Sequence, residues 1–432
     1  AYLRTDTNGP RPVTFVWNGG PGAASLWLHM GAFGPKRVVV PSDAEPPGLP
    51  PYPVENAVET ILDVTDLVFV DPVGTGYSRA LGEHEGKEFW GLNEDAQSIA
   101  EFIRSWVTDN HRWNAPRFLL GESYGTTRAA AVADLLESDF MMRLNGVILI
   151  SQALDYAGSS PYVRDNLISH VSYLPTMAAA ASYHHKVVPR PDALESFLVE
   201  ARQFASDVLL PALWKGNALT SAERSAIVRG LQRYTGLSAE YIERANLRVQ
   251  GFRFAKELLR SEGKVIGLLD ARYTVDEVDD LAADPAGDAA DSAVSAAFKS
   301  ALMEYLQADL KVDWARLYLA PADENLNKEW NWRTAPDGEP WEPWPINTAH
   351  KLSHALSVNP DLRVLVAAGY FDLVTPFFDA EFTLNRHDID ASRIDYRYYH
   401  GGHMMYVNEP SRTRLLDDTR QFMKQQLEQG ND

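Results

Sequence analysis

The sequence predicts an α/β protein whose mostly parallel central sheet is flanked by helices and interrupted by a helical insertion. Short β-rich runs alternate with helical stretches in the first third of the chain, helical patterns dominate the middle, and strand patterns return near the end. We therefore expect the first part of the sheet domain over residues 1–155, a mainly helical insertion or cap over 156–345, and the second part of the sheet domain over 346–432.

The expected strands are short runs of apolar and β-branched residues, and they cover residues 13–17, 66–70, 118–120, 147–150, 363–368 and 395–399. The expected helices are longer and cover residues 92–108, 127–136, 193–210, 221–234, 294–310 and 412–426. Parallel strands need long crossover connections, so helices between successive strands indicate a parallel sheet. The stretch 276–291 is acidic and rich in Ala and Asp, and we interpret it as a surface loop.

The composition narrows the functional classes. The chain has 432 residues, of which 45% are apolar and 23% charged, as is typical of a packed globular protein. Its formal net charge of −19 repels phosphate backbones, so nucleic acid is not an expected partner. No apolar run is long enough to span a bilayer, and the lack of cysteine excludes disulfides, thiolate metal sites and cysteine nucleophiles. The oligomeric state cannot be read from the sequence.

Residues 121–125 read Gly-Glu-Ser-Tyr-Gly and fit the Gly-x-Ser-x-Gly pattern of a nucleophile elbow. The motif requires a strand before the serine and a helix after it, and the runs 118–120 and 127–136 supply both. The two glycines let the backbones approach where a side chain would clash. We therefore predict that Ser123 is the nucleophile of a serine hydrolase with the α/β-hydrolase fold.

A serine nucleophile needs a general base, and the base needs an acid that orients it. In this fold the order along the chain is Ser, acid, His. Asp372 follows the strand 363–368, and His403 follows the strand 395–399 after two glycines that allow a tight turn. Both residues are expected at the sheet edge where Ser123 emerges.

Each of these two residues has a rival. Asp379 is the nearest alternative acid, but it lies further past its strand, where we expect a helix. His400 is the alternative base, at the end of its strand. Asp372 could also be a simple turn or helix-cap aspartate.

The first strand ends in residues 17–22, Trp-Asn-Gly-Gly-Pro-Gly. In a hydrolase, a glycine run after an early strand usually supplies one oxyanion-hole N–H, and the residue after the nucleophile, here Tyr124, supplies the other. The alternative is a simple tight turn. Residues 71–78 also follow a strand, but they lack the third glycine of a dinucleotide fingerprint, so we interpret them as a loop lining the site.

Together, residues 17–22, 71–78, 121–125, Asp372 and 402–404 resemble the serine carboxypeptidase family, and the similarity covers nearly the whole chain. The segment 173–185 is similar to the bacterial members. The resemblance implies that peptides with a free C-terminus are the substrates and that neither a cofactor nor a metal is needed.

The resemblance also implies roles for individual residues. The triad would consist of Ser123, Asp372 and His403, and the oxyanion hole of Gly20 and Tyr124. The group that grips the substrate's terminal carboxylate would consist of Asn18, Gly19 and Glu122. Release of C-terminal residues follows from that grip, because only a chain end presents a carboxylate there.

Glu122 leads to an expectation about pH. The carboxylate of Glu122 and the terminal carboxylate of the substrate cannot lie together if both are charged. One of them must hold a proton, and this raises the pKa of Glu122. We therefore expect an acidic optimum for peptide hydrolysis. The alternative is that Glu122 pairs with a cation such as Arg128.

The sequence departs from the family pattern in two places that matter. A second family glutamate would fall on Ala32, and Ala23, Ala24 and Ser25 stand where the family has a Cys and two Ser. The missing glutamate at position 32 keeps open an esterase or acyltransferase that uses the same triad, and a catalytically silent binding protein is a further alternative. The chain begins at Ala1 without a Met or a leader, so we expect an exported protein, periplasmic or extracellular, whose N-terminal segment was processed, trimmed or disordered.

Overall fold

The computed structural model describes residues 1–5, 11–160, 163, 166–320, 322, 324–335, 339, 341 and 345–429. Within these residues the centre is a six-stranded sheet in the order β10-β9-β6-β5-β1-β4, and neighbouring strands pair in parallel throughout. Its strands are β1 (Val13–Trp17), β4 (Asp66–Phe69), β5 (Arg117–Glu122), β6 (Gly146–Ile150), β9 (Arg363–Gly369) and β10 (Ile394–Tyr399). The predicted α/β fold with a parallel sheet is confirmed.

Both faces of the sheet are covered, which is why its central strands read as nearly continuous apolar runs. In β1, Val13, Phe15 and Trp17 pack against one helical layer, whereas Val16 lies in the apolar cluster of the opposite face. The first layer contains α2 (Leu92–Asp109), α3 (Tyr124–Ser138) and α13 (Ala349–Val358), and the second contains α1 (Leu26–Leu28), α11 (Ala289–Glu304) and α15 (Glu409–Gln429). Successive side chains of β1 thus point to opposite faces of the sheet and contribute to the apolar clusters on both faces.

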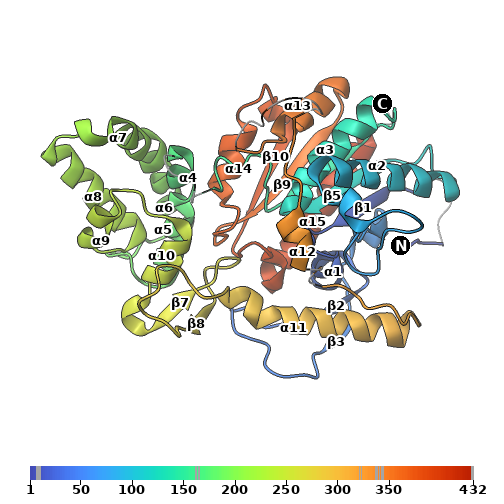
Figure 1. Ribbon diagram of the computed structural model, residues 1–432, viewed down its shortest axis with the longest axis horizontal. Coiled ribbons are helices and arrows are strands. Elements are labelled where there is room, and N and C mark those ends of the chain that lie inside the picture. The colour runs from blue at the N-terminus through green and yellow to red at the C-terminus, as the bar shows by residue number, and fades with distance from the viewer. Residues whose placement is uncertain are drawn as a thin grey trace.

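Between β6 and β9 the chain forms mostly helices, and the first seven of them lie beside the sheet domain (Figure 1). They are α4 (Leu167–Ser172), α5 (Leu174–Tyr183), α6 (Leu194–Gln203), α7 (Leu210–Lys215), α8 (Ser221–Thr235), α9 (Ala239–Arg244) and α10 (Gly251–Glu257). The hairpin β7 (Lys264–Ile266)–β8 (Thr274–Asp276) and α12 (Glu324–Glu329) also belong to this segment, whereas α11 and α13 pack on the sheet. Helices α4–α10 form an apolar cluster of their own, which also includes Phe371 and Phe377 from the segment after β9. The domain boundaries expected from the sequence stay a prediction.

The remaining elements are small. The hairpin β2 (Lys36–Val38)–β3 (Val54–Asn56) lies near α11, and α14 (Phe377–Leu384) follows β9. The expected acidic loop is confirmed for residues 277–287, but Asp288 already caps α11 by accepting hydrogen bonds from the N–H groups of Ala290 and Asp291. None of the described helices has the length and apolar character needed to cross a membrane.

Candidate active site

The carboxyl ends of the parallel strands meet at one edge of the sheet, and there each strand continues into a loop that carries a predicted site residue. β1 leads to Asn18, β5 to Ser123, β9 to Asp372 and β10 to His403. Crevices at this edge are the usual ligand sites of open α/β sheets.

Ser123 lies at the apex of the turn between β5 and α3, with φ 60° and ψ −132°. A non-glycine residue seldom adopts a positive φ, so the turn is strained, as a nucleophile elbow is. A Cβ on Gly121 would lie 2.1 Å from the carbonyl oxygen of Gly125, so a side chain there would clash with the returning backbone. The side chain of Ser123 is half-buried at the head of α3.

His403 and Asp372 are brought together across the ends of β9 and β10. The Nδ1 atom of His403 lies 2.7 Å from Oδ2 of Asp372, and both side chains are buried. Asp372 also accepts hydrogen bonds from the N–H groups of Val374 and Thr375 and from the Thr375 hydroxyl, at 2.8, 2.9 and 2.7 Å. A carboxylate held in this way keeps the imidazole proton on Nδ1 and leaves Nε2 as the base.

The two rivals lie elsewhere. Asp379 is buried on α14, where it packs against the backbone at Gly158. The Nε2 atom of His400 lies 2.8 Å from Oε1 of Glu195, and both side chains are more than half exposed. These contacts lie away from the hydrogen bond between His403 and Asp372, so neither Asp379 nor His400 takes part in the predicted triad.

Backbone contacts fix the loop that carries His403. The N–H of His403 donates to the carbonyl of Leu269 at 2.5 Å, and the Ser151 hydroxyl donates to the carbonyl of His403 at 2.7 Å. The N–H of Gly402 donates to Oδ2 of Asp270 at 3.0 Å. His403 is thus held by Ser151, directly after β6, on one side and by the inserted segment on the other.

Asp270 is itself part of a buried ion pair. Nε and Nη2 of Arg272 donate to its carboxylate at 2.9 and 2.6 Å, and Nη1 of Arg272 donates to the carbonyl of His400 at 2.9 Å. The guanidinium also lies over the ring of Phe371, 5.3 Å from its centre. Sequence reasoning missed both residues, because an Asp-x-Arg triplet looks like any other pair of surface charges until tertiary packing buries it.

The glycine run after β1 lies directly against the nucleophile turn. A Cβ on Gly19 would lie 2.6 Å from the amide nitrogen of Tyr124 and 2.8 Å from the Cβ of Ser123, so no side chain fits there. Gly20 has φ 104°, in the region that favours glycine. The indole N–H of Trp17 donates to the carbonyl of Gly125 at 2.8 Å and ties the two turns together.

The loop 71–78 supports the glycine run from outside. Oδ1 of Asp71 accepts a hydrogen bond from the N–H of Ser25 at 2.8 Å. Leu326 of α12 covers both loops, since a Cβ on Gly22 or on Gly74 would lie 2.7 or 3.0 Å from its side chain. The inserted segment thus closes over the loops that flank the nucleophile.

Asn18 and Glu122 form the buried pair expected beside the nucleophile. The side-chain amide of Asn18 donates to Oε1 of Glu122 at 2.9 Å, and its oxygen accepts from the N–H of Leu28 at 3.1 Å. Burial raises the pKa of Glu122 to about 7, although the positive charge on His403 opposes the shift. The second carboxylate oxygen, Oε2, has no hydrogen-bond partner.

Arg128 is not the counterion of Glu122. Its Nε donates to Oδ2 of Asp95 at 2.6 Å, its Nη1 donates to the carbonyl of Asn18 at 2.9 Å, and the Arg128–Asp95 pair is fully buried. The alternative interpretation of Glu122 as an ion-pair partner of Arg128 is therefore wrong. Arg128 instead fixes the backbone at Asn18.

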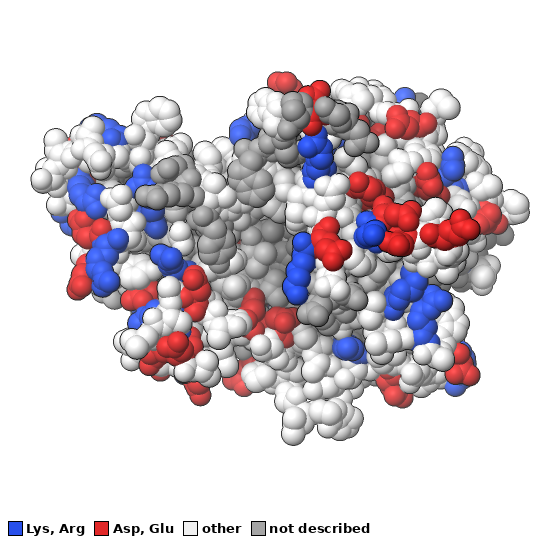
Figure 2. Space-filling model, in the orientation of Figure 1, with Lys and Arg blue, Asp and Glu red and all other residues white. Residues whose placement is uncertain are grey.

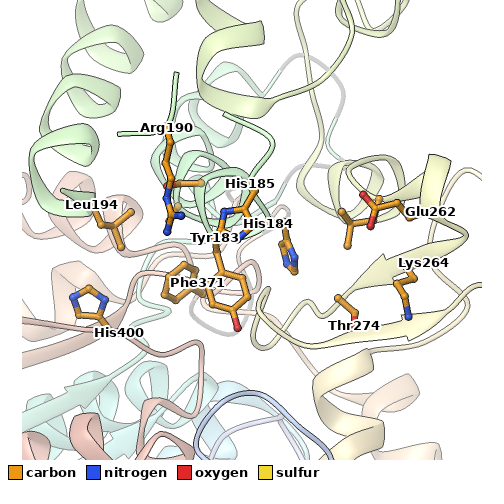
Figure 3. A pocket seen from close by; sticks show the side chains of 13 residues that line it. Tyr183, His184, His185, Arg190, Leu194, Glu262, Lys264, Thr274, Phe371 and His400 are labelled. Atoms are coloured by element: carbon orange, nitrogen blue, oxygen red, sulfur yellow. The ribbon is translucent and has the colours of Figure 1, made fainter. Parts of the chain in front are cut away.

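A cavity of about 670 Å³ lies between the inserted helices and the triad loops (Figure 3). Phe371 and His400 line it from the sheet domain, and Tyr183, His184 and Lys264 line it from the insertion. The Nε2 atom of His184 lies 2.6 Å from the carbonyl oxygen of Ala271. Phe371 directly precedes the acid of the predicted triad, so the cavity adjoins the site.

Comparisons with known proteins agree with this architecture. Residues 2–184 match the family described as serine carboxypeptidase. A comparison with curated protein sequences gave no match. Among solved structures, a prohormone-processing carboxypeptidase from Saccharomyces cerevisiae is similar, with a TM-score of 0.58 and 16% identity over 96% of this chain and 85% of that chain. A proline iminopeptidase from Mycobacterium smegmatis has a TM-score of 0.36 and 14% identity over 96% and 90%. The chain has the α/β-hydrolase fold.

Proposed function

We propose, from the match of residues 2–184 to the serine carboxypeptidase family, that the chain is a hydrolase that releases single residues from the C-terminus of peptides. The observation that carries the proposal is the buried pair of Asn18 and Glu122 beside Ser123. A neutral glutamic acid in that position can share its proton with a carboxylate, and the main chain of a peptide offers one beside a peptide bond only at its C-terminal end.

Each step of the reaction has a group to perform it. Ser123 attacks the carbonyl carbon of the last peptide bond while Nε2 of His403 takes its proton. Asp372 orients the imidazole and stabilises its positive charge. The N–H groups of Gly20 and Tyr124 stabilise the oxyanion. His403 then protonates the leaving amine, and water hydrolyses the acyl-enzyme after His403 has taken one of its protons.

The proposal includes an acidic optimum. The pKa of Glu122 is raised to about 7, so the group is protonated below that pH and loses its proton above it. A substrate carboxylate is repelled by the ionised form and accepted by the neutral one. Peptide binding should therefore weaken as the pH rises through about 7.

Digestion of a peptide library, followed by mass spectrometry, tests the proposal. We expect ladders that lose one residue at a time from the C-terminus, and none with Ser123→Ala. A fluorophosphonate probe should label Ser123 in the unmodified chain, which would exclude a catalytically silent binding protein. Internal cuts, or no labelling, would contradict the proposed function.

An esterase or acyltransferase on the same triad is the second candidate, and Ala32 is the observation that favours it. Ala32 is buried and provides no acid where the family resemblance places one. Equal or faster turnover of an ester or C-terminal amide, compared with the matching free-acid peptide, would favour this candidate.

The setting is also part of the proposal. The match of residues 2–184 to this family supports an exported protein, periplasmic or extracellular, that acts on peptides without nucleic acid as a partner. Fractionation of the producing cell, with activity followed in each fraction, tests the setting. Activity confined to the cytoplasmic fraction would contradict it.

A further inference from the structure

Tyr406 lies three residues after His403, in the short helical turn Met405–Val407, and only 2% of it is exposed. Its ring packs on Gly31, because a Cβ there would lie 2.6 Å from Cε2 of the tyrosine. The hydroxyl group is buried and completes no hydrogen bond of ordinary geometry. A buried polar atom without a well-formed hydrogen bond is rare and calls for an explanation, such as a role in catalysis or contact with a bound molecule.

The hydroxyl of Tyr406 faces the group beside the nucleophile. It interacts with the carboxyl of Glu122 and with the side chain of Asn18. Oε2 of Glu122 also lacks a hydrogen-bond partner, whereas Oε1 accepts from Asn18. The Tyr406 hydroxyl and the Glu122 carboxyl therefore interact with each other in one buried place beside Ser123, but neither the hydroxyl nor Oε2 completes a hydrogen bond of ordinary geometry.

We propose that Tyr406 binds the terminal carboxylate of the substrate together with Glu122. This inference rests on the proposed carboxypeptidase function. A carboxylate has two oxygens, and each can accept one hydrogen bond from these groups. Because Oε1 of Glu122 already accepts from Asn18, the acid proton lies on Oε2 and donates to one substrate oxygen. The Tyr406 hydroxyl donates to the other.

The position of Tyr406 also accounts for the missing acid. Ala32 stands where the family resemblance places a second glutamate, and Gly31, its neighbour, supports the tyrosine ring. Tyr406 is thus a second donor from a different segment of the chain. Burial and the nearby Glu122 raise the pKa of its hydroxyl, so it keeps its proton and remains a donor.

Tyr406→Phe tests the inference, because it removes the hydroxyl and leaves the ring on Gly31. We expect KM for a free-acid peptide to rise about tenfold or more, as for a lost hydrogen bond to a charged group, with kcat changed little. KM for the matching C-terminal amide should stay the same. Tyr396→Phe on β10 is the control, since it removes another buried hydroxyl without a partner, and both substrates should behave as with the unmodified chain.

The outcomes separate this inference from the proposed function. If the unmodified chain prefers the free acid and Tyr406→Phe keeps that preference, Tyr406 is not a carboxylate ligand, although the proposed function stands. Equal losses on acid and amide would show a merely structural role. No preference for the free acid in the unmodified chain would overturn both. If Tyr406→Phe does not fold, Gly31→Ala displaces the ring instead and should cause the same selective loss.

Discussion

Glu122 and His403 form a coupled pair of titrating groups beside Ser123. Burial favours the neutral forms of both, but the attraction and hydrogen bond of Asp372, together with the charge of Glu122, raise the pKa of His403. The proposed reaction requires a neutral His403 and a protonated Glu122. The state with a protonated His403 and an ionised Glu122 holds the same number of protons as the state with a neutral His403 and a protonated Glu122. The two states therefore compete at a single pH. In the proposed reaction the substrate carboxylate would repel the ionised Glu122 and shift the proton from His403 to Glu122, so that His403 becomes neutral.

Replacement of Glu122 by glutamine should remove the alkaline limb of the pH profile. In the unmodified chain, kcat/KM for a free-acid peptide should fall as the pH rises through about 7, because Glu122 then loses its proton. Glutamine stays neutral and still donates an N–H, so Glu122→Gln should keep its kcat/KM above that pH. The measurement is kcat/KM from about pH 4 to about pH 9, with a C-terminal amide as the control substrate. An unchanged alkaline fall in the variant would show that another group titrates.

At the scale of elements, the inserted segment 267–273 connects the two loops of the predicted triad. The carbonyl of Leu268 accepts from the N–H of Leu373 at 2.9 Å, and the carbonyl of Leu269 accepts from the N–H of His403 at 2.5 Å. One inserted loop thus contacts both the loop of Asp372 and the loop of His403. The insertion therefore helps to position the predicted triad as well as covering it.

Asp270→Asn should weaken this connection. Asp270 accepts from the N–H of Gly402 and pairs with the buried Arg272, so the change leaves a buried cation without its counterion, at a cost of about 3–5 kcal/mol. We expect a lower melting temperature and a kcat that falls on the order of tenfold to a hundredfold, because a small displacement of the base is costly. KM should change less than kcat.

Asp276→Asn is the matched control for this prediction. It breaks the ion pair of Lys264 with Asp276 in the same hairpin, where the aspartate side chain is 88% exposed, and exposed pairs contribute little. If both variants lose activity equally, the hairpin as a whole, and not the contact of Asp270 with Gly402, matters for the reaction.

The sequence predicted the sheet and its edge well, because local patterns determine them. Ser123, Asp372 and His403 each follow a short apolar run, and in a parallel sheet the ends of such runs meet at one edge. Helical periodicity in 294–310 correctly indicated a helix, but it gave no partner. That helix, α11, begins at Ala289 and packs into the core of the sheet domain rather than on α4–α10.

Residues that act through distant contacts could not be predicted in the same way. Tyr406 meets Glu122 and Gly31 only after the chain folds, and no periodicity indicates that its hydroxyl lacks a partner. Asp270 likewise reaches Gly402 across a long separation in sequence. Such residues become visible from unsatisfied or buried polar atoms, which are properties of the packed structure.

At the scale of the whole molecule, the dominant feature is an excess of acidic side chains. The formal net charge is −19 at pH 7 and the sequence pI is about 5.0. Figure 2 shows Lys and Arg interspersed among Asp and Glu on the viewed face, so the excess is spread and no single acidic patch dominates there. A distributed net charge acts on approaching substrates through the long-range field, which salt screens.

This field predicts a salt dependence that changes sign with the charge of the peptide. The test compares two free-acid peptides that differ only in a Lys or a Glu several residues from the scissile bond. Near pH 7 the cationic peptide should be attracted and the anionic one repelled, so raising the salt from about 10 to about 500 mM should lower kcat/KM for the first and raise it for the second. Near the pI of about 5.0 the net charge is small, and both slopes should become nearly flat. Equal slopes for the two peptides near pH 7 would mean that local contacts at the site, and not the charge of the whole molecule, govern their approach.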